Sequence, residues 1–292
     1  MTDKNNLTIR EACVSDRQTL ANLIQFEVYV HRHLDWRQPL DWIDDNPFFI
    51  ASSGNEVLAT IACPTDPPQV AWIHLLAISE KLSLKKTWFT LWRTVKRYYE
   101  QRSSVTIAVI PRQDWFEFLL KESGFKLANQ VLMLLWEGGE IPPARHIPGL
   151  IIRRMHFEDL TNVEALDTQA FDPIWRISKL SLISAYRQAA YASVSEMNNK
   201  LVGYQISTIS HHGGHLARLA VHPDVQRTGI GYNLVQDILV HLKQRGAHNI
   251  SVNTQANNYS SLALYEQFGF QKTCEIIPTY QYAIHPNHHN PE

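Results

Sequence analysis

Residues 216–232 read Leu-Ala-Arg-Leu-Ala-Val-His-Pro-Asp-Val-Gln-Arg-Thr-Gly-Ile-Gly-Tyr, and this stretch decides the fold. Its apolar run ends at His222-Pro223, because proline offers no backbone donor and restricts the residue before it. Gly229 and Gly231 then open a helix, and glycine lets the backbone approach a bulky group closely. The loop and the first helical turn leave free N–H groups beside the positive end of the helix dipole. The stretch therefore predicts an anion site that suits a pyrophosphate.

The glycine spacing separates this stretch from two common phosphate-binding loops. A nucleoside-triphosphate loop would need Gly-Lys-Ser or Gly-Lys-Thr, and the chain contains neither. A dinucleotide fingerprint needs three glycines, whereas Gln226-x-x-Gly229-x-Gly231 has two. A Gly-x-Gly pair on its own is also compatible with an ordinary tight turn, so a second motif has to decide.

That second motif lies downstream, where Asn258 is followed seven residues later by Tyr265 in a segment that ends in Gly269-Phe270. Together, the two segments resemble the Arg/Gln-x-x-Gly-x-Gly/Ala and Asn-x-x-Ala-x-x-Leu-Tyr-x-x-x-Gly-Phe motifs of the GNAT N-acetyltransferase superfamily. The resemblance implies direct transfer of acetyl from acetyl-CoA to a primary amine. It also implies an α/β (α+β) fold with a mixed, mostly antiparallel sheet flanked by helices.

The resemblance also implies roles for individual residues of the second half. The strand at 250–255 would splay away from the strand at 216–222, and the pantetheine arm would lie between them. Tyr265 would be the general acid that protonates the leaving thiolate, although a core position is an alternative for this residue. Asn258 would steady the pantetheine end, and it would also suit a helix N-cap. The implied cofactor-binding residues are Leu219, Ala220, Val221, Gln226, Arg227, Thr228, Gly229, Ile230, Gly231, Tyr232 and Asn258.

The acceptor side of the site is less well defined by the sequence. Residues 213–222 contain no carboxylate that could act as the base. The unperturbed pKa of histidine would suit His215 to the role of base. The surrounding His211-His-Gly-Gly-His215 instead favours the tip of a hairpin. A chain of waters is the alternative to a side-chain base. Arg218, placed by strict alternation on the face of Leu216 and Ala220, is a candidate for binding an acidic substrate group, or else a structurally paired arginine. Trp175 and Asp172, from the loop between the first two helices, are the other substrate candidates.

The composition limits the number of domains, the classes of partner and the cellular compartment that the sequence allows. The 292 residues, 45% of them apolar, suffice for two domains. A net charge of −1 gives no global attraction for nucleic acid or an anionic membrane. The three scattered cysteines favour neither a disulfide framework nor a metal site and fit a reducing cytoplasm. The polar start carries no apolar signal core, and no apolar run approaches the length of a membrane span.

Three segments of the first half recur in the second at a nearly constant offset, which predicts a tandem duplication. We expect a degenerate GNAT-like domain at 1–136, a Pro- and Gly-rich linker at 137–149, the acetyltransferase domain at 150–285 and a disordered tail at 286–292. The first copy has Ser83-Leu-Lys-Lys-Thr-Trp88 where the second has the glycine loop, and Leu120 where the second has Tyr265. These differences predict a single cofactor site, in the second half.

The sequence leaves two questions of function open. The missing carboxylate leaves a non-catalytic acyl-CoA sensor or regulatory module as the alternative to an enzyme. A small-molecule amine is the favoured acceptor class, by resemblance to tandem members of the family. Two joined halves could replace the dimer of single-copy relatives, so a monomer is expected, with a homodimer as the alternative.

Overall fold

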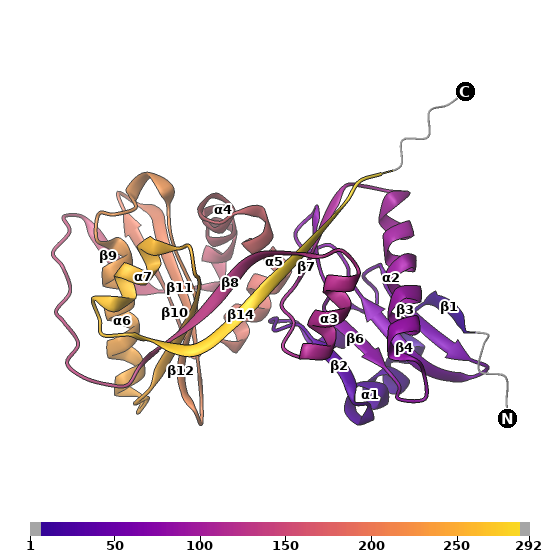
Figure 1. Ribbon diagram of the computed structural model, residues 1–292. Coiled ribbons are helices and arrows are strands. Elements are labelled where there is room, and N and C mark those ends of the chain that lie inside the picture. Colours follow the sequence, from indigo (N-terminus) through magenta and orange to yellow (C-terminus); the bar gives the residue numbers. More distant parts are fainter. Residues whose placement is uncertain (1–6, 287–292) are drawn as a thin grey trace. The chain divides into compact units, whose positions relative to one another are not determined.

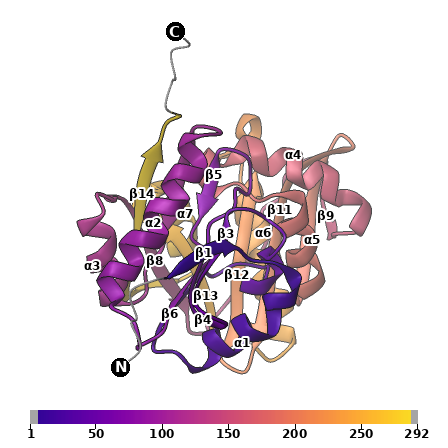
Figure 2. The same cartoon turned by 90° about the vertical axis from the view of Figure 1, so that its right-hand side faces the viewer.

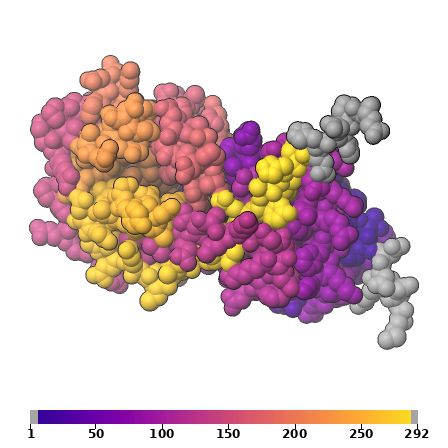
Figure 3. All heavy atoms as spheres, turned by 45° about the horizontal axis from the view of Figure 1, so that its top comes forward, coloured from indigo at the N-terminus to yellow at the C-terminus, as the bar shows by residue number. Residues whose placement is uncertain are grey.

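The computed structural model describes residues 7–286 and divides into two compact units (Figure 1). The first unit is Met1–Ala128 together with Pro278–Glu292, and the second is Asn129–Ile277. These limits differ from the predicted ranges at two long strands. Strand β8 (Lys126–Trp136) begins in the first unit and crosses into the second at Asn129. Strand β14 (Gln271–Ile284), among the yellow atoms of Figure 3, begins in the second unit and ends in the first. The predicted disordered tail lies, apart from Pro286, outside the described residues.

The second unit contains the β14-β8-β13-β12-β11-β10-β9 part of a nine-stranded sheet that continues from β14 to β7 and β5. Strand β12 pairs in parallel with β13 and antiparallel with β11, and the pairs β13–β8, β11–β10 and β10–β9 are antiparallel. The remaining elements are β9 (Leu150–Arg154), α4 (Leu160–Ala170), α5 (Lys179–Gln188), β10 (Tyr191–Met197), β11 (Lys200–Ser210), β12 (Gly213–Val221), α6 (Ile230–Gln244), β13 (Ile250–Gln255) and α7 (Tyr259–Glu266).

Helix α6 follows directly from the apolar pattern of the sequence. Its buried residues recur at helical spacing and pack into two apolar clusters with β12, β13 and α7. Gly246 follows the helix at a φ of 86°, which only glycine adopts readily, and closes the last turn. The segment predicted as a linker also packs on this helix: the Arg145 backbone N–H donates to Asn233 Oδ1 and Asn233 Nδ2 donates to the Arg145 carbonyl, both at 2.8 Å. It therefore belongs to the second unit.

The first unit repeats this plan with a different strand order. Its five-stranded antiparallel sheet has the order β1-β3-β4-β6-β2, and β5 pairs in parallel with β7. Leu20 and Leu23 of α1 pack on one face of the five-stranded sheet, and Trp88, Trp92 and Tyr99 of α2 pack on the other. Figure 2 labels the two helices and the strands of this sheet. The elements are β1 (Thr8–Glu11), α1 (Arg17–Phe26), β2 (Tyr29–Arg32), β3 (Phe48–Ser53), β4 (Glu56–Ala62), β5 (Val70–Trp72), β6 (Leu75–Ile78), α2 (Leu84–Glu100), β7 (Val105–Val109) and α3 (Asp114–Glu122).

The two units share the register expected for a duplicated chain. Val70 pairs with Thr106 in the first unit, and Gly214 pairs with Ile250 in the second. Gly214 follows Val70 in the sequence by the same number of residues as Ile250 follows Thr106. One element departs from the predicted order. Leu20, Leu23, Ile24 and Val28 recur at helical spacing and predict a helix over residues 15–29. In the structure, α1 ends at Phe26 and Tyr29 begins β2. Glu27 is already extended (φ −88°, ψ 152°), because the chain turns there to pair with β6.

A buried histidine on β2 makes the stability of the first unit depend on pH. His31 is fully buried, and burial lowers its pKa to about 4, aided by the positive charge of His74 and Arg112 and opposed by the Ile73 carbonyl and by Gln113. The unfolded chain therefore binds this proton at a higher pH than the folded chain. We expect the free energy of unfolding to fall as pH drops from about 6.5 to about 4, by up to roughly 1.4 kcal/mol per pH unit from this group. Urea titrations of His31→Gln across this range should give a shallower slope, and an unchanged slope would contradict the assignment.

Candidate functional site

The glycine loop joins the end of β12 to the start of α6. Arg227 (φ 64°) and Gly229 (φ 97°) both have left-handed backbone, which turns the loop sharply into the helix. The Asn233 N–H donates to the Gly229 carbonyl at 3.1 Å, and this is the first bond of the helical ladder. The N–H groups of residues 230–232 precede that bond and point out of the helix start. They are the donors that an anionic group would find here.

Side chains within the loop hold this conformation. Gln226 Nε2 donates to the Val221 carbonyl at 3.1 Å, and Thr228 Oγ1 donates to the Val225 carbonyl at 2.7 Å. A Cβ on Gly231 would lie 3.3 Å from Leu264 Cδ2, so this glycine lets α6 approach α7 closely. The side chain of Tyr232 points away from the loop, since its hydroxyl donates to the Pro143 carbonyl at 3.4 Å. Of this residue, only the backbone N–H faces the predicted anion site.

Strands β12 and β13 separate as the resemblance implies. They pair only at three positions, Gly214↔Ile250, His215↔Ser251 and Leu216↔Val252. The next residue, Ala217, has no partner in the register with β11, because Leu216 pairs with Ser207 and Arg218 with Ile206. This is a β-bulge, which bends a strand and ends pairing. Beyond the bulge, residues 218–221 of β12 have an edge that β13 does not cover, here called the open edge.

Backbone direction decides which groups face the open edge. The His222 N–H donates to the Val202 carbonyl at 2.8 Å, so the backbone of His222 faces β11. Since direction alternates along a strand, Ala220 also faces β11, and Leu219 and Val221 face the open edge. The bond from Gln226 to the Val221 carbonyl agrees with this direction. The expectation that Ala220 meets the cofactor through its backbone is therefore corrected: its N–H and C=O serve the sheet.

Asn258 lies at the start of α7, the helix that follows β13, and Tyr265 lies within this helix. Asn258 caps this helix, since its Oδ1 accepts from the Ser261 N–H at 3.1 Å, in agreement with the alternative interpretation as an N-cap. Tyr265 is 4% exposed and packs beside Phe270. Burial raises the pKa of its phenol, so the hydroxyl keeps its proton at neutral pH. Within residues 7–286 that hydroxyl makes no hydrogen bond.

The bulge at Ala217 also reverses the expected face of Arg218. Leu216 packs in the apolar cluster of α6, whereas the guanidinium of Arg218 lies 2.6 Å from the Asp167 carboxylate of α4. The prediction that both side chains share one face was wrong, because the unpaired residue between them breaks the alternation of the strand. The structure instead supports the alternative, a structurally paired arginine.

Arg218 belongs to a buried network that fixes the loop between α4 and α5. Its Nη2 donates to the Trp175 carbonyl at 2.6 Å, and its guanidinium lies 4.1 Å from the centre of the Phe171 ring. Asp167 accepts from the Ile177 N–H at 3.0 Å and from the Tyr204 hydroxyl. Sequence analysis missed Asp167, although a carboxylate beside Leu166 and Val163 on the apolar face of a helix is a recognisable signal.

Breaking this network is expected to destabilise the second unit. Asp167 is fully buried, so Arg218→Met would leave its carboxylate without a positively charged neighbour, and we expect a loss of about 3 kcal/mol in the free energy of unfolding. Adding Asp167→Asn removes the unpaired charge but keeps an oxygen for Ile177, so the double variant should recover part of the loss. Urea denaturation measures both, and equal stability of Arg218→Met and the wild type would contradict the structural role.

The other candidates lie on or near this loop. Asp172 is exposed, and its carbonyl accepts from the Trp175 N–H at 2.8 Å. Their roles toward a substrate stay predictions. His215 lies on the paired part of β12, where its Nδ1 is 2.9 Å from Ser251 Oγ, and burial lowers its pKa. It is therefore placed before the open edge, and the turn at 211–212 is the hairpin tip.

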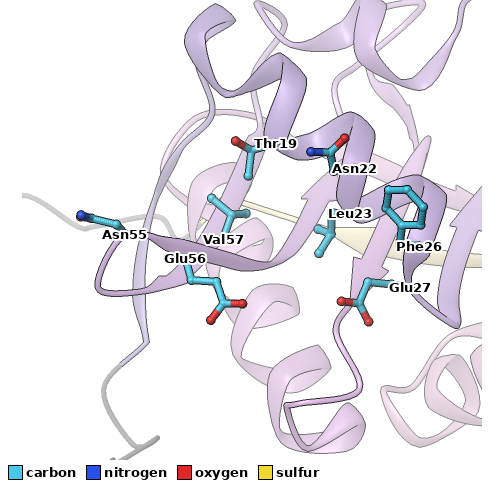
Figure 4. A pocket seen from close by; sticks show the side chains of 8 residues that line it. All are labelled: Thr19, Asn22, Leu23, Phe26, Glu27, Asn55, Glu56 and Val57. Carbon is cyan, nitrogen blue, oxygen red and sulfur yellow. The ribbon is translucent and has the colours of Figure 1, made fainter.

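The first unit has different groups at the corresponding positions. Trp88, at the position of Gly231, is fully buried in the core, and its indole N–H donates to Ser123 Oγ at 2.7 Å. Leu120, at the position of Tyr265, is also fully buried. The unit has an open cavity of about 530 Å³ between α1 and the β3–β4 hairpin (Figure 4). Its two carboxylates are already engaged, Glu27 with the Glu80 N–H and Glu56 with Lys81.

No group of three or more His, Cys, Asp or Glu side chains in residues 7–286 is arranged to hold a metal ion. Over the same residues, every helix is too short or too polar to cross a bilayer.

Comparisons with known proteins agree with this geometry. Residues 158–270 match the acetyltransferase (GNAT) family model. The ribosomal protein bS18-alanine N-acetyltransferase of Escherichia coli (strain K12) is 32% identical over 75 residues, which cover 26% of this chain and 51% of the relative. An uncharacterized N-acetyltransferase of Methanocaldococcus jannaschii is 26% identical over 133 residues, which cover 45% of this chain and 83% of the relative. The chain thus spans about half the length of the first of these relatives.

Solved structures extend the likeness to both units. A GCN5-related N-acetyltransferase from Sphaerobacter thermophilus has a TM-score of 0.60 at 13% identity and covers 98% of both chains. A tandem GNAT protein from the clavulanic acid biosynthesis pathway has a TM-score of 0.63 at 12% identity, and the match covers 96% of this chain and 99% of that one. At these identities the likeness shows the fold, which is that of tandem GNAT proteins. The match to the acetyltransferase (GNAT) family model lies within the second unit.

Proposed function

We propose that the second unit is an N-acetyltransferase that transfers acetyl directly from acetyl-CoA to a primary amine of a small molecule. The observation that carries this proposal is the continuity of two features on one chain segment. The open edge of β12 offers the backbone of Leu219 and Val221 to a strand-like arm. Directly after it, the left-handed turn at Gly229 offers the N–H groups of residues 230–232 to a pyrophosphate. Acetyl-CoA has both parts in this order.

The residues around the opening suit the chemistry of acyl transfer. Acetyl-CoA, when bound, supplies an activated acyl thioester. The amine nitrogen bonds to the acyl carbon, the carbon–sulfur bond breaks, and the sulfur takes a proton. Tyr265 is our proposed donor of that proton, since burial keeps its phenol protonated. The N–H groups at the open edge are donors for the developing negative charge on the acyl oxygen. We expect water to accept the proton of the amine, because residues 213–222 carry no carboxylate.

We further propose that the chain has one such site. The first unit lacks both loop glycines, and Trp88 fills the position of Gly231 with a buried indole. Leu120 cannot replace the phenol of Tyr265 as a proton donor. These differences remove both the phosphate loop and the proposed acid from the first copy.

The amines to be tested as acetyl acceptors, here called the acceptor panel, are chosen from the family resemblance and from the relatives. Small-molecule amines, among them amino acids, polyamines and aminoglycosides, come first. Peptides that begin with alanine belong in the panel, because one relative is named as an alanine N-acetyltransferase of ribosomal protein bS18.

Calorimetric titration of the full chain with acetyl-CoA tests the proposal, followed by thiol release with the acceptor panel. One site per chain and thiol release with an amine would support it. One site without thiol release from any amine would favour an acyl-CoA sensor, which the missing carboxylate on β12 also fits. No binding by a folded chain would refute both interpretations.

A further inference from the structure

Strand β6 of the first unit corresponds to the open-edge segment of β12. Strand β6 pairs antiparallel with β4, as β12 pairs with β11. Each pairing ends in the same backbone bond: the Ser79 N–H donates to the Leu58 carbonyl, and the His222 N–H donates to the Val202 carbonyl, both at 2.8 Å. A bulge precedes each segment, and in the second unit it is the bulge at Ala217. In the first unit, the His74 N–H donates to the Ala62 carbonyl although Leu75 is the register partner of Ala62, so two residues of one strand lie opposite one residue of the other. The two segments are therefore equivalent, with Ser79 in the place of His222.

The equivalent edge in the first unit is covered. Strand β2 pairs antiparallel with β6 from Tyr29↔Ile78 to Arg32↔Leu75, and the ladder continues where the His33 N–H donates to the His74 carbonyl at 3.0 Å. Because the Ser79 backbone faces β4, alternation directs the backbones of Leu76 and Ile78 toward β2. Their counterparts in the second unit are Leu219 and Val221, which face the open edge.

Side chains of β2 contact the element that corresponds to α7. Tyr29 lies edge to face with Trp115 at 5.5 Å between ring centres, and His31 lies 4.6 Å from Phe116. Both aromatic residues belong to α3, which follows β7 as α7 follows β13. Strand β2 therefore pairs with β6 and packs against α3, which correspond to the open-edge segment of β12 and to α7 in the second unit.

We infer that β2 is a built-in occupant of the first unit's cofactor cleft, with its main chain in the place that a pantetheine arm would take in the second unit. This inference rests on the cleft assigned under the proposed function. An added strand satisfies the same edge donors and acceptors that an extended ligand would. It also seals the cleft with a side chain, since His31 is fully buried with its Nε2 3.1 Å from the Ile73 carbonyl. The first unit is thus closed to acyl-CoA by its own chain, independently of its missing glycines.

Residue-resolved amide hydrogen exchange of the full chain, with and without saturating acetyl-CoA, tests this inference. Without ligand, we expect the amides of Leu76 and Ile78 to exchange at least about tenfold more slowly than those of Leu219 and Val221. With acetyl-CoA, Leu219 and Val221 should slow while Leu76 and Ile78 stay unchanged. Fast exchange of Leu76 and Ile78 without ligand, or added protection of these two amides with it, would overturn the inference. If only Leu219 and Val221 fail to respond, the proposed function fails and the occupancy of the first cleft stands.

A matched pair of proline variants probes the same edge. Alternation directs the His31 N–H toward β6, so His31→Pro removes a ladder donor and should speed exchange at Leu76 and Ile78 by at least about tenfold. The Val30 N–H instead donates to the Val28 carbonyl at 3.1 Å, so Val30→Pro removes no bond to β6. Equal exchange in folded His31→Pro, Val30→Pro and wild type would contradict the pairing. Should a variant not fold, the wild-type comparison still decides.

Discussion

Gly229→Val is expected to weaken acetyl-CoA binding at least about 100-fold, which corresponds to roughly 2.7 kcal/mol. Gly229 has a φ of 97°, a left-handed conformation that a β-branched residue adopts only with strain. A Cβ there would also lie 3.4 Å from Ile147 Cδ1. The loop would relax to another conformation, and the N–H groups of residues 230–232 would no longer converge on the pyrophosphate. Calorimetric titration with acetyl-CoA measures the change.

Gly246→Val is the matched control for this prediction. Gly246 follows the other end of α6 with a φ of 86°, and a Cβ there would meet nothing within 4 Å. The control therefore adds the same kind of backbone strain to the same helix without touching the loop. We expect it to lower stability and to leave the dissociation constant within about twofold of wild type. Tight binding by folded Gly229→Val would refute the assignment of the loop.

Tyr265→Phe is expected to lower kcat by about 10²- to 10⁴-fold while the dissociation constant for acetyl-CoA stays nearly unchanged. The hydroxyl has no hydrogen-bond partner among residues 7–286, so its removal leaves no buried group unsatisfied and the fold should tolerate the change. The raised pKa adds a pH signature. A tyrosine that stays protonated beyond its usual range cannot cause a loss of activity on the alkaline side between pH 7 and pH 10.

Tyr191→Phe serves as the control for loss of a tyrosine hydroxyl in the same unit. This hydroxyl donates to Asp237 at 2.9 Å, and neither residue belongs to the loop, the open edge or α7. Steady-state kinetics with an accepted amine should show a change of no more than about twofold for the control. If Tyr265→Phe keeps the wild-type kcat, another group protonates the sulfur and Tyr265 is a core residue.

Local signals in the sequence were sufficient for the helix, the loop and the repeat. The spacing of apolar residues determined α6, because only one face of a helix can be buried against the sheet. The two glycines determined the sharp entry into that helix, and Gly229 does adopt the left-handed conformation. The separation of β12 from β13 followed from the resemblance of these motifs to a known family. The recurrence of segments at a nearly constant offset indicated the duplication, which the two parallel strand pairs repeat.

Tertiary structure alone decided which groups meet across the sheet. The bulge at Ala217 turns Arg218 away from Leu216 and onto Asp167, since an unpaired residue on one strand depends on the register of its neighbour. Residues 29–32 form a strand rather than a helical turn because β6 offers them an unpaired edge, and β3 and β4 separate β6 from them along the chain. Likewise, β14 ends in the first unit because β7 pairs with it there. Local propensity determines the periodicity of helices and strands and the positions of turns. Strand register and the pairing of sheet edges depend on partners that are distant in the sequence, so a single segment does not encode them.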